Sequence, residues 1–255
     1  MILNRGVTMK KRHQFTTLIL CLLTQFLLAQ SENDALKNKN ILIVYGGWLG
    51  HQPEVFAHKI ANWLEAQQVN VTLSKSTGIY LDKTVMSKTD LIIQHITMST
   101  IKSSESKALQ NAVANGTALA GCHGGLGDAF RNDTEYQYMI GGQFVKHPGG
   151  QVDYTVNISE PEHIITEGIN DFSLNSEQYY MHLDPSINVI ATTVFNGDHD
   201  PWIEGVEMPV VWTKTYGKGK IFYSSLGHSA DIFEIPEVWK IMTHGVTWAV
   251  SKNMN

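Results

Sequence analysis

The sequence contains little cysteine and has no excess of basic residues. It has two cysteines in 255 residues, and its formal net charge is -5 at pH 7. A protein that binds nucleic acid needs a basic face for the phosphate backbone, so this charge argues against a nucleic-acid partner. Cys21 falls within an N-terminal leader, which leaves Cys122 as the one thiol of the mature chain. One thiol cannot form an internal disulfide.

The sequence also lacks an uninterrupted apolar run of the roughly 20 residues that a membrane-spanning helix needs. The apolar stretch 18–29 is broken by Thr24 and Gln25 and follows the basic cluster MKKR. This layout is typical of a secretory signal peptide. We predict a signal peptide over residues 1–30, followed by a disordered polar lead over residues 31–40. A retained N-terminal anchor is the alternative interpretation.

Export without a disulfide favours the periplasm of a Gram-negative bacterium. Cleavage near residues 29–31 would remove the apolar stretch. The mature protein is therefore expected to have no stable membrane association.

Strand and helix patterns alternate in the first half of the chain. Continuous apolar runs at 41–47, 89–96 and 117–122 are typical of buried parallel strands, and 53–68 and 103–116 have helical spacing. This alternation predicts a parallel α/β sheet. Further strand patterns follow at 151–158, 177–183, 188–195 and 208–228, and residues 236–250 have the apolar spacing of a helix. With no internal repeat or linker, one domain over residues 41–250 is predicted.

Histidine is the abundant functional residue type, with eleven copies. His51, His95 and His123 each lie at or just after the carboxyl end of a predicted parallel strand. Ligands bind beyond these ends in open α/β sheets, so the three imidazoles are expected at one edge, where a binding site belongs.

The stretch LAGCHGGLG, residues 119–127, has the pattern of a nucleophile elbow. In the frame Gly-x-X-x-Gly, which starts at Gly121, the central residue is His123 and not Cys122. Glycines at such a corner hold the central residue on a strained, exposed turn before a helix. Successive side chains of a strand point to opposite faces, so Cys122 is expected in the core. A hydrolase dependent on Cys122 remains as the less favoured alternative.

Five further segments extend this pattern: GGQFVKHP, EHIITEGI, EQYYMHLDP, PVVWTKTYGKGKIFYSSLGH and the final helix. Together with the elbow they resemble the ThuA-like (trehalose utilisation) family of the class I glutamine amidotransferase-like superfamily, over about Ile41 to Val250. The resemblance implies a flavodoxin-like α/β fold, with a mostly parallel sheet, helices on both faces and additional strands in the second half. It also implies a role in carbohydrate metabolism, on trehalose, similar disaccharides or their keto derivatives.

The sequence departs from the amidotransferases of this superfamily at two positions. His123 occupies the place of their cysteine, and Ala230 follows the later histidine, His228, where a glutamate is expected. Without the nucleophile and the orienting acid, glutamine hydrolysis is not expected.

We therefore predict a histidine-rich cleft that binds a small carbohydrate, with His123 and His228 as the catalytic residues. The residues predicted to bind substrate are Trp48, His51, His147, Tyr180 and His182. Imidazole is a common ligand of divalent metals, so zinc or a similar ion could be held by the predicted set His51, His123, His147, His182 and His228.

Two other interpretations of the same residues remain open. Histidines could act as acid and base on a sugar without a metal, or the fold could be a non-catalytic periplasmic sugar-binding module. Carboxylates at Asp128, Glu177 and Asp184 form a second set of candidate partners, and Trp202 is a further aromatic that could stack on a sugar ring.

Overall fold

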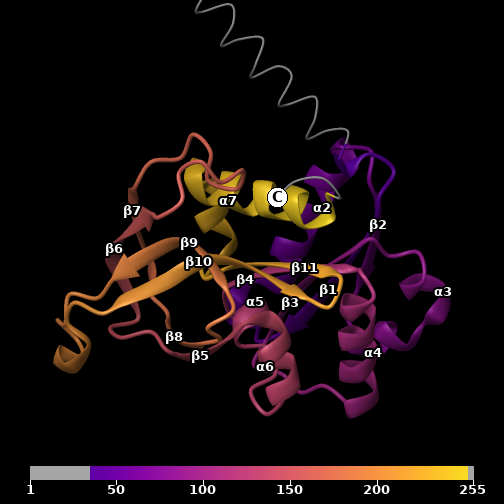
Figure 1. Cartoon of the computed structure of the whole chain (residues 1–255), viewed down its shortest axis with the longest axis horizontal. Helices are drawn as coiled ribbons and strands as arrows, with labels where there is room; N and C mark the ends of the chain where they lie inside the picture. The colour runs from indigo at the N-terminus through magenta and orange to yellow at the C-terminus, as the bar shows by residue number, and fades with distance from the viewer. Residues whose placement is uncertain (1–34, 252–255) are drawn as a thin grey trace, which may run out of the picture.

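The computed structural model describes residues 35–251, and the predicted signal peptide lies outside this range. Its main element is a sheet of nine strands in the order β2-β1-β3-β4-β11-β10-β9-β6-β7 (Figure 1). Five neighbouring strands are parallel: β2 (Asn70–Ser74), β1 (Asn40–Gly47), β3 (Leu91–Thr97), β4 (Ala118–Cys122) and β11 (Gly219–Ser224). The sheet continues with antiparallel pairing through β10 (Glu207–Tyr216), β9 (Asn188–Val194), β6 (Gln151–Ile158) and β7 (Phe172–Glu177).

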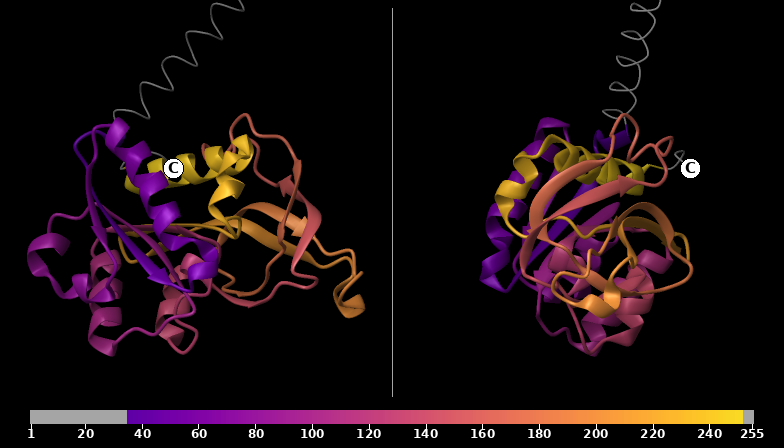
Figure 2. Two further views of the ribbon diagram at one scale, coloured as in Figure 1. Left: turned by 180° about the vertical axis from the view of Figure 1, so that it is seen from behind. Right: turned by 90° about the vertical axis from the view of Figure 1, so that its left-hand side faces the viewer.

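Helices cover both faces of the parallel half (Figures 1 and 2). On one face, α2 (Pro53–Ala66) and α7 (Pro236–Val250) bury apolar residues such as Phe56 and Ile241 in one core cluster. On the other face, α4 (Ser103–Ala114), α5 (His123–Gly127) and α6 (Thr134–Ile140) contribute to a second cluster. The central strands are apolar on both sides because each side meets a layer of helices. The predicted α/β fold with added strands is confirmed.

Short elements complete the chain. A two-stranded antiparallel sheet pairs β5 (Gly142–Lys146) with β8 (Tyr180–Leu183). The single-turn helices are α3 (Lys83–Met86), η1 (Leu49–His51), η2 (Thr77–Leu81), η3 (Pro201–Ile203) and η4 (Ala230–Glu234). Within residues 35–251, no helix has both the length and the apolar character needed to cross a membrane.

The predicted strand 177–183 is wrong as a single element, although its residues Tyr180–Leu183 form β8. Glu177 ends β7, and β8 begins at Tyr180 in the smaller sheet. The chain changes direction at Gln178, whose side-chain amide donates hydrogen bonds to Thr193 Oγ1 and to the Val194 carbonyl. This fixed turn separates Glu177 from β8, which the pattern of residues 177–183 joined in one strand. Helix α6 and strand β5 were not predicted.

The expected disordered lead is ordered over its final residues. Residues 35–36 form a helical turn, and Leu36 is only 2% exposed within the cluster that includes α2 and α7. One leucine in an otherwise polar run is enough to dock this segment, although the mean composition of the run suggests disorder.

Leu36→Ala should therefore lower the free energy of unfolding by about 2–5 kcal/mol, because it leaves a cavity in the core. Urea denaturation measures this change. Leu49 is the matched control, since it is 81% exposed and its replacement by alanine should change stability by less than about 0.5 kcal/mol. Equal stability of the two variants would show that the lead does not dock.

Candidate functional site

Three histidines and one glutamate converge at the carboxyl edge of the parallel strands. His51 lies on η1 just after β1, His123 follows β4, and His228 follows β11. Glu177 reaches the same place from the end of β7. One ligand atom from each of the four residues lies within 4.8 Å of those of the other three.

The elbow places His123 in this cluster. His123 has φ of 49°, in the left-handed region, at the junction of β4 and α5. The glycines that follow leave space for neighbouring imidazoles. A Cβ atom on Gly124 would lie 2.8 Å from the His51 ring, and one on Gly125 would lie 2.2 Å from His95 Nδ1. The strained corner predicted for His123 is confirmed, and only glycine at 124 and 125 lets α5 approach this closely.

The prediction that this corner is exposed is wrong. His123 is completely buried, and the Tyr179 ring stacks on it at a centroid distance of 4.0 Å. Tyr179 follows Glu177 by two residues, so the turn after β7 covers the elbow as well as supplying the carboxylate.

Hydrogen bonds fix the protonation of His123. Its Nδ1 lies 2.7 Å from the Ser225 carbonyl oxygen, and its Nε2 lies 3.0 Å from Glu177 Oε2. A carbonyl only accepts, so Nδ1 carries the proton and donates it to Ser225. In the neutral imidazole, the lone pair of Nε2 then faces the Glu177 carboxylate.

The other two histidines approach the same carboxylate. His51 Nδ1 lies 2.9 Å from Thr97 Oγ1, and its Nε2 lies 3.9 Å from Glu177 Oε2. His228 Nδ1 lies 3.2 Å from Glu177 Oε1. The Glu177 carboxylate is therefore the common centre of the three imidazoles.

Burial keeps the imidazoles of His51 and His123 neutral. It lowers the pKa of His51 to about 3, assisted by repulsion from His123, and it also lowers the pKa of His123. Burial alone would raise the pKa of Glu177, but the close approach of His123 and His228 outweighs it and holds that pKa well below its ordinary value. An ionised carboxylate and nitrogen lone pairs thus share a small space at neutral pH.

Three imidazoles and one carboxylate match the ligand chemistry of zinc and similar divalent ions. Two of the imidazoles also have the supporting hydrogen bonds that orient metal ligands. Nδ1 of His123 is bonded to Ser225, and Nδ1 of His51 is bonded to Thr97, so both Nε2 atoms are directed inward. His51, His123, Glu177 and His228 are the residues that could hold a metal.

The remaining predicted site residues lie at different distances from this centre. His147 is at the rim, with Nε2 3.6 Å from Glu177 Oε1. Trp48 is 45% exposed, and its ring meets the His51 ring edge-on at 4.7 Å. His182 is exposed on β8 opposite Gln143 and is outside the group of four. Tyr180 is half-buried, with its ring 5.8 Å from that of Phe195.

Glu177 is the functional residue that the predicted site lacked. The sequence shows it as one of several carboxylates at the start of an apparent strand, where nothing distinguishes it from Asp184. In the structure, Asp184 pairs with Lys214 at 2.9 Å, and Asp128 forms two hydrogen bonds with Arg131. Those two carboxylates have structural partners, whereas Glu177 faces the histidines.

Cys122 points into the core as predicted. It is buried, its Sγ lies 3.7 Å from His95 Nδ1, and burial raises the pKa of the thiol well above its ordinary value. A protonated, inaccessible thiol is a poor nucleophile, so this geometry argues against a hydrolase that depends on Cys122.

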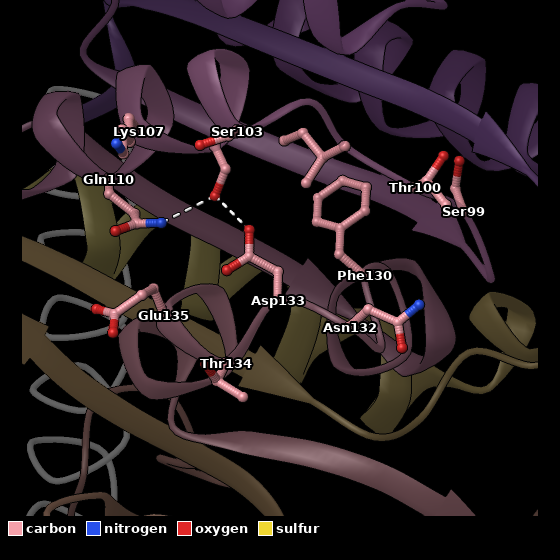
Figure 3. A pocket seen from close by; sticks show the side chains of 12 residues that line it. Ser99, Thr100, Ser103, Lys107, Gln110, Phe130, Asn132, Asp133, Thr134 and Glu135 are labelled. Carbon is pink, nitrogen blue, oxygen red and sulfur yellow. Dashed lines mark hydrogen bonds between the residues drawn. The ribbon is translucent and has the colours of Figure 1, made fainter.

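A separate cavity of about 580 Å³ lies beside α4 and the start of α6 (Figure 3). Ser106 Oγ donates to Asp133 Oδ2 at 2.5 Å and accepts from Gln110 Nε2 at 2.8 Å. None of the four clustered residues lines this cavity. It is therefore distinct from the histidine site.

Comparisons with known proteins agree with this architecture. A model of the ThuA family, described as trehalose utilisation, matches residues 40–249. A ThuA-like protein from Parabacteroides merdae has a TM-score of 0.70 and 19% identity, over 86% of this chain and 92% of that one. A ThuA-like protein from Bacteroides uniformis has a TM-score of 0.68 and 15% identity, over 86% and 95%. The comparison with curated proteins gives no match.

The buried histidines predict a loss of stability in acid. Burial lowers the pKa of His95 from 6.5 to about 3, so below pH 6.5 the unfolded chain binds a proton that the folded protein does not. The free energy of unfolding should fall by about 1.4 kcal/mol per pH unit for this residue as the pH drops from 6.5 toward 3. His95→Gln removes this titrating group, so it should reduce the pH dependence of the free energy of unfolding by about 1.4 kcal/mol per pH unit.

Urea denaturation between pH 4 and 8, with a chelator present, measures both slopes. The difference in the free energy of unfolding between the two proteins at pH 8 gives the general stability loss of the variant, and it is subtracted at each lower pH. Identical slopes for the two proteins would contradict the burial of a neutral His95.

Proposed function

The chain belongs to the ThuA family, and from this premise we propose that it acts on a disaccharide or keto-glycoside in the histidine-rich cleft, assisted by a divalent metal such as zinc. The family description, trehalose utilisation, supports a role in carbohydrate metabolism. The observation that carries the proposal is the convergence of His51, His123 and His228 on the Glu177 carboxylate.

In this proposal the four converging residues are metal ligands. His51 and His123 would bind through Nε2, because their Nδ1 atoms are engaged with Thr97 and Ser225. A bound divalent cation supplies a Lewis acid that polarises a sugar carbonyl or hydroxyl oxygen. Such a site needs no local ligand motif, since the fold brings the residues together from four distant segments.

Residues at the rim would handle the substrate. His147 is partly exposed and is placed to accept a proton from a sugar hydroxyl or from the carbon next to a ketone. The exposed Trp48 ring offers an apolar face for the C–H groups of a pyranose. This assignment moves proton transfer from His123 to His147, because both nitrogens of His123 already have partners.

Removal of the metal should abolish turnover of a keto-disaccharide. Protein as purified, chelated protein and protein reloaded with zinc or manganese would be compared for metal content and for loss of substrate. Glu177→Gln should lower metal occupancy at least tenfold, because it removes the anionic ligand.

His182→Ala is the matched control, since this exposed histidine lies outside the group of four. It should retain full metal content. Turnover that survives chelation would contradict the metal-assisted mechanism. Sugar binding without turnover in the metal-loaded protein would favour a non-catalytic binding module.

Export is a second part of the proposal, supported by the basic cluster and short apolar run of residues 1–30. Expression of the full chain in a Gram-negative host should place the mature protein in the periplasmic fraction. N-terminal sequencing should then find a new terminus near residues 29–31. An uncleaved chain in the cytoplasmic fraction would contradict export.

A further inference from the structure

A polar cavity of about 440 Å³ lies next to the histidine cluster along the chain. Its lining includes Pro148 and Gln178, which directly follow His147 and Glu177. A smaller hollow of about 330 Å³ shares Asp153, Gln178 and Asn196 with it. The chain segments that carry His147 and Glu177 therefore each contribute the next residue to the lining of this cavity.

The lining consists mainly of amides and carboxylates that are already held in place. Asn175 Nδ2 donates to Asp153 Oδ1 at 2.8 Å, on two paired strands. Gln178 Nε2 donates to Thr193 Oγ1 at 2.8 Å. Amides and carboxylates pair well with sugar hydroxyls, which both donate and accept, and fixed side chains reduce the entropy lost on binding.

The charge of the cavity selects against anionic ligands. Asp153, Asp198 and Asp200 line it, and its described lining contains no lysine or arginine. The cation next to it, Lys146, is 2.6 Å from Asp200 and so is already paired. A phosphorylated or acidic sugar would be repelled, whereas a neutral sugar would not.

A tryptophan lies in the chain segment that contributes Asp200 and Ile203 to this cavity. Trp202 is 78% exposed on η3, and its neighbour Ile203 lines the cavity. The segment that carries it, between β9 and β10, projects from the edge of the sheet (Figure 1).

Two contacts hold this segment against the rest of the site. One is the Lys146–Asp200 ion pair. The other is the His199 ring, which lies 2.3 Å from where a Cβ of Gly149 would stand. An indole left exposed on a held segment is suited to stacking on a sugar ring.

We propose that this cavity is a subsite for the second sugar unit of a neutral disaccharide whose first unit occupies the histidine cluster. The inference rests on the proposed function and names its substrate class. Amide and carboxylate groups bind the hydroxyls of the second unit, and Trp202 covers one of its faces.

Calorimetric titration of the metal-loaded protein with trehalose tests this subsite. Asn175→Ala and Trp202→Ala should each weaken trehalose binding about tenfold, as expected for the loss of one hydrogen bond to a sugar or one stacking contact. Tyr138→Ala removes an exposed aromatic ring on α6 that does not line the cavity, and it should leave the affinity unchanged. Trehalose 6-phosphate should bind the wild-type protein more weakly than trehalose.

Unchanged trehalose affinity in both cavity variants would overturn the proposal, as would the absence of trehalose binding to the wild-type protein. Tighter binding of the phosphorylated sugar would overturn the neutral selectivity. Failure of the proposed function has a different signature. Turnover would then be insensitive to chelation, while trehalose binding would still depend on Asn175 and Trp202.

Discussion

The site depends on one physical constraint, which is that the ionised Glu177 carboxylate must be compensated where water is scarce. Three imidazoles surround it, with nitrogen atoms 3.0 Å, 3.2 Å and 3.9 Å from its oxygens. Burial lowers the pKa of His51 and His123, so these partners are neutral at pH 7. A divalent cation at this centre would balance the carboxylate and use the imidazole lone pairs. The hydrogen bond between His51 and Thr97, and the one that His123 donates to the Ser225 carbonyl, would orient both rings toward such a centre.

The mixed sheet is what makes this convergence possible. Parallel strands β1, β4 and β11 end at one edge and deliver the three histidines, as open α/β sheets do for their ligands. The antiparallel extension folds back so that the end of β7 supplies Glu177 and the following turn supplies Tyr179 as a cover. The parallel half of the sheet therefore supplies the three histidines, and the antiparallel half supplies the carboxylate and the aromatic ring that covers His123. The antiparallel half also contributes to the polar cavity, whose lining includes Asp153, Asp198 and Asp200.

The sequence predicts the parallel half well because its signals are local. Continuous apolar runs, helical spacing and the glycine frame around His123 each lie within a few residues, and they indicate the strands, the helices and the strained corner correctly. Long-range contacts decide the rest. The burial of His123 depends on Tyr179, and the docking of Leu36 depends on the core beneath it. Likewise, His182 and Glu177 both look like plausible ligands in the sequence. The turn at Gln178 places Glu177 at the end of β7 and His182 on β8, outside the cluster.

Anomalous diffraction from crystals of the zinc-loaded protein tests the central claim most directly. One strong anomalous peak is expected between Nε2 of His51, Nε2 of His123, Nδ1 of His228 and the Glu177 carboxylate, at about 2.0–2.2 Å from each ligand atom. His147 and His182 should not be ligands. A peak at other residues, or an empty centre in which Glu177 Oε2 stays 3.0 Å from His123 Nε2, would contradict this expectation.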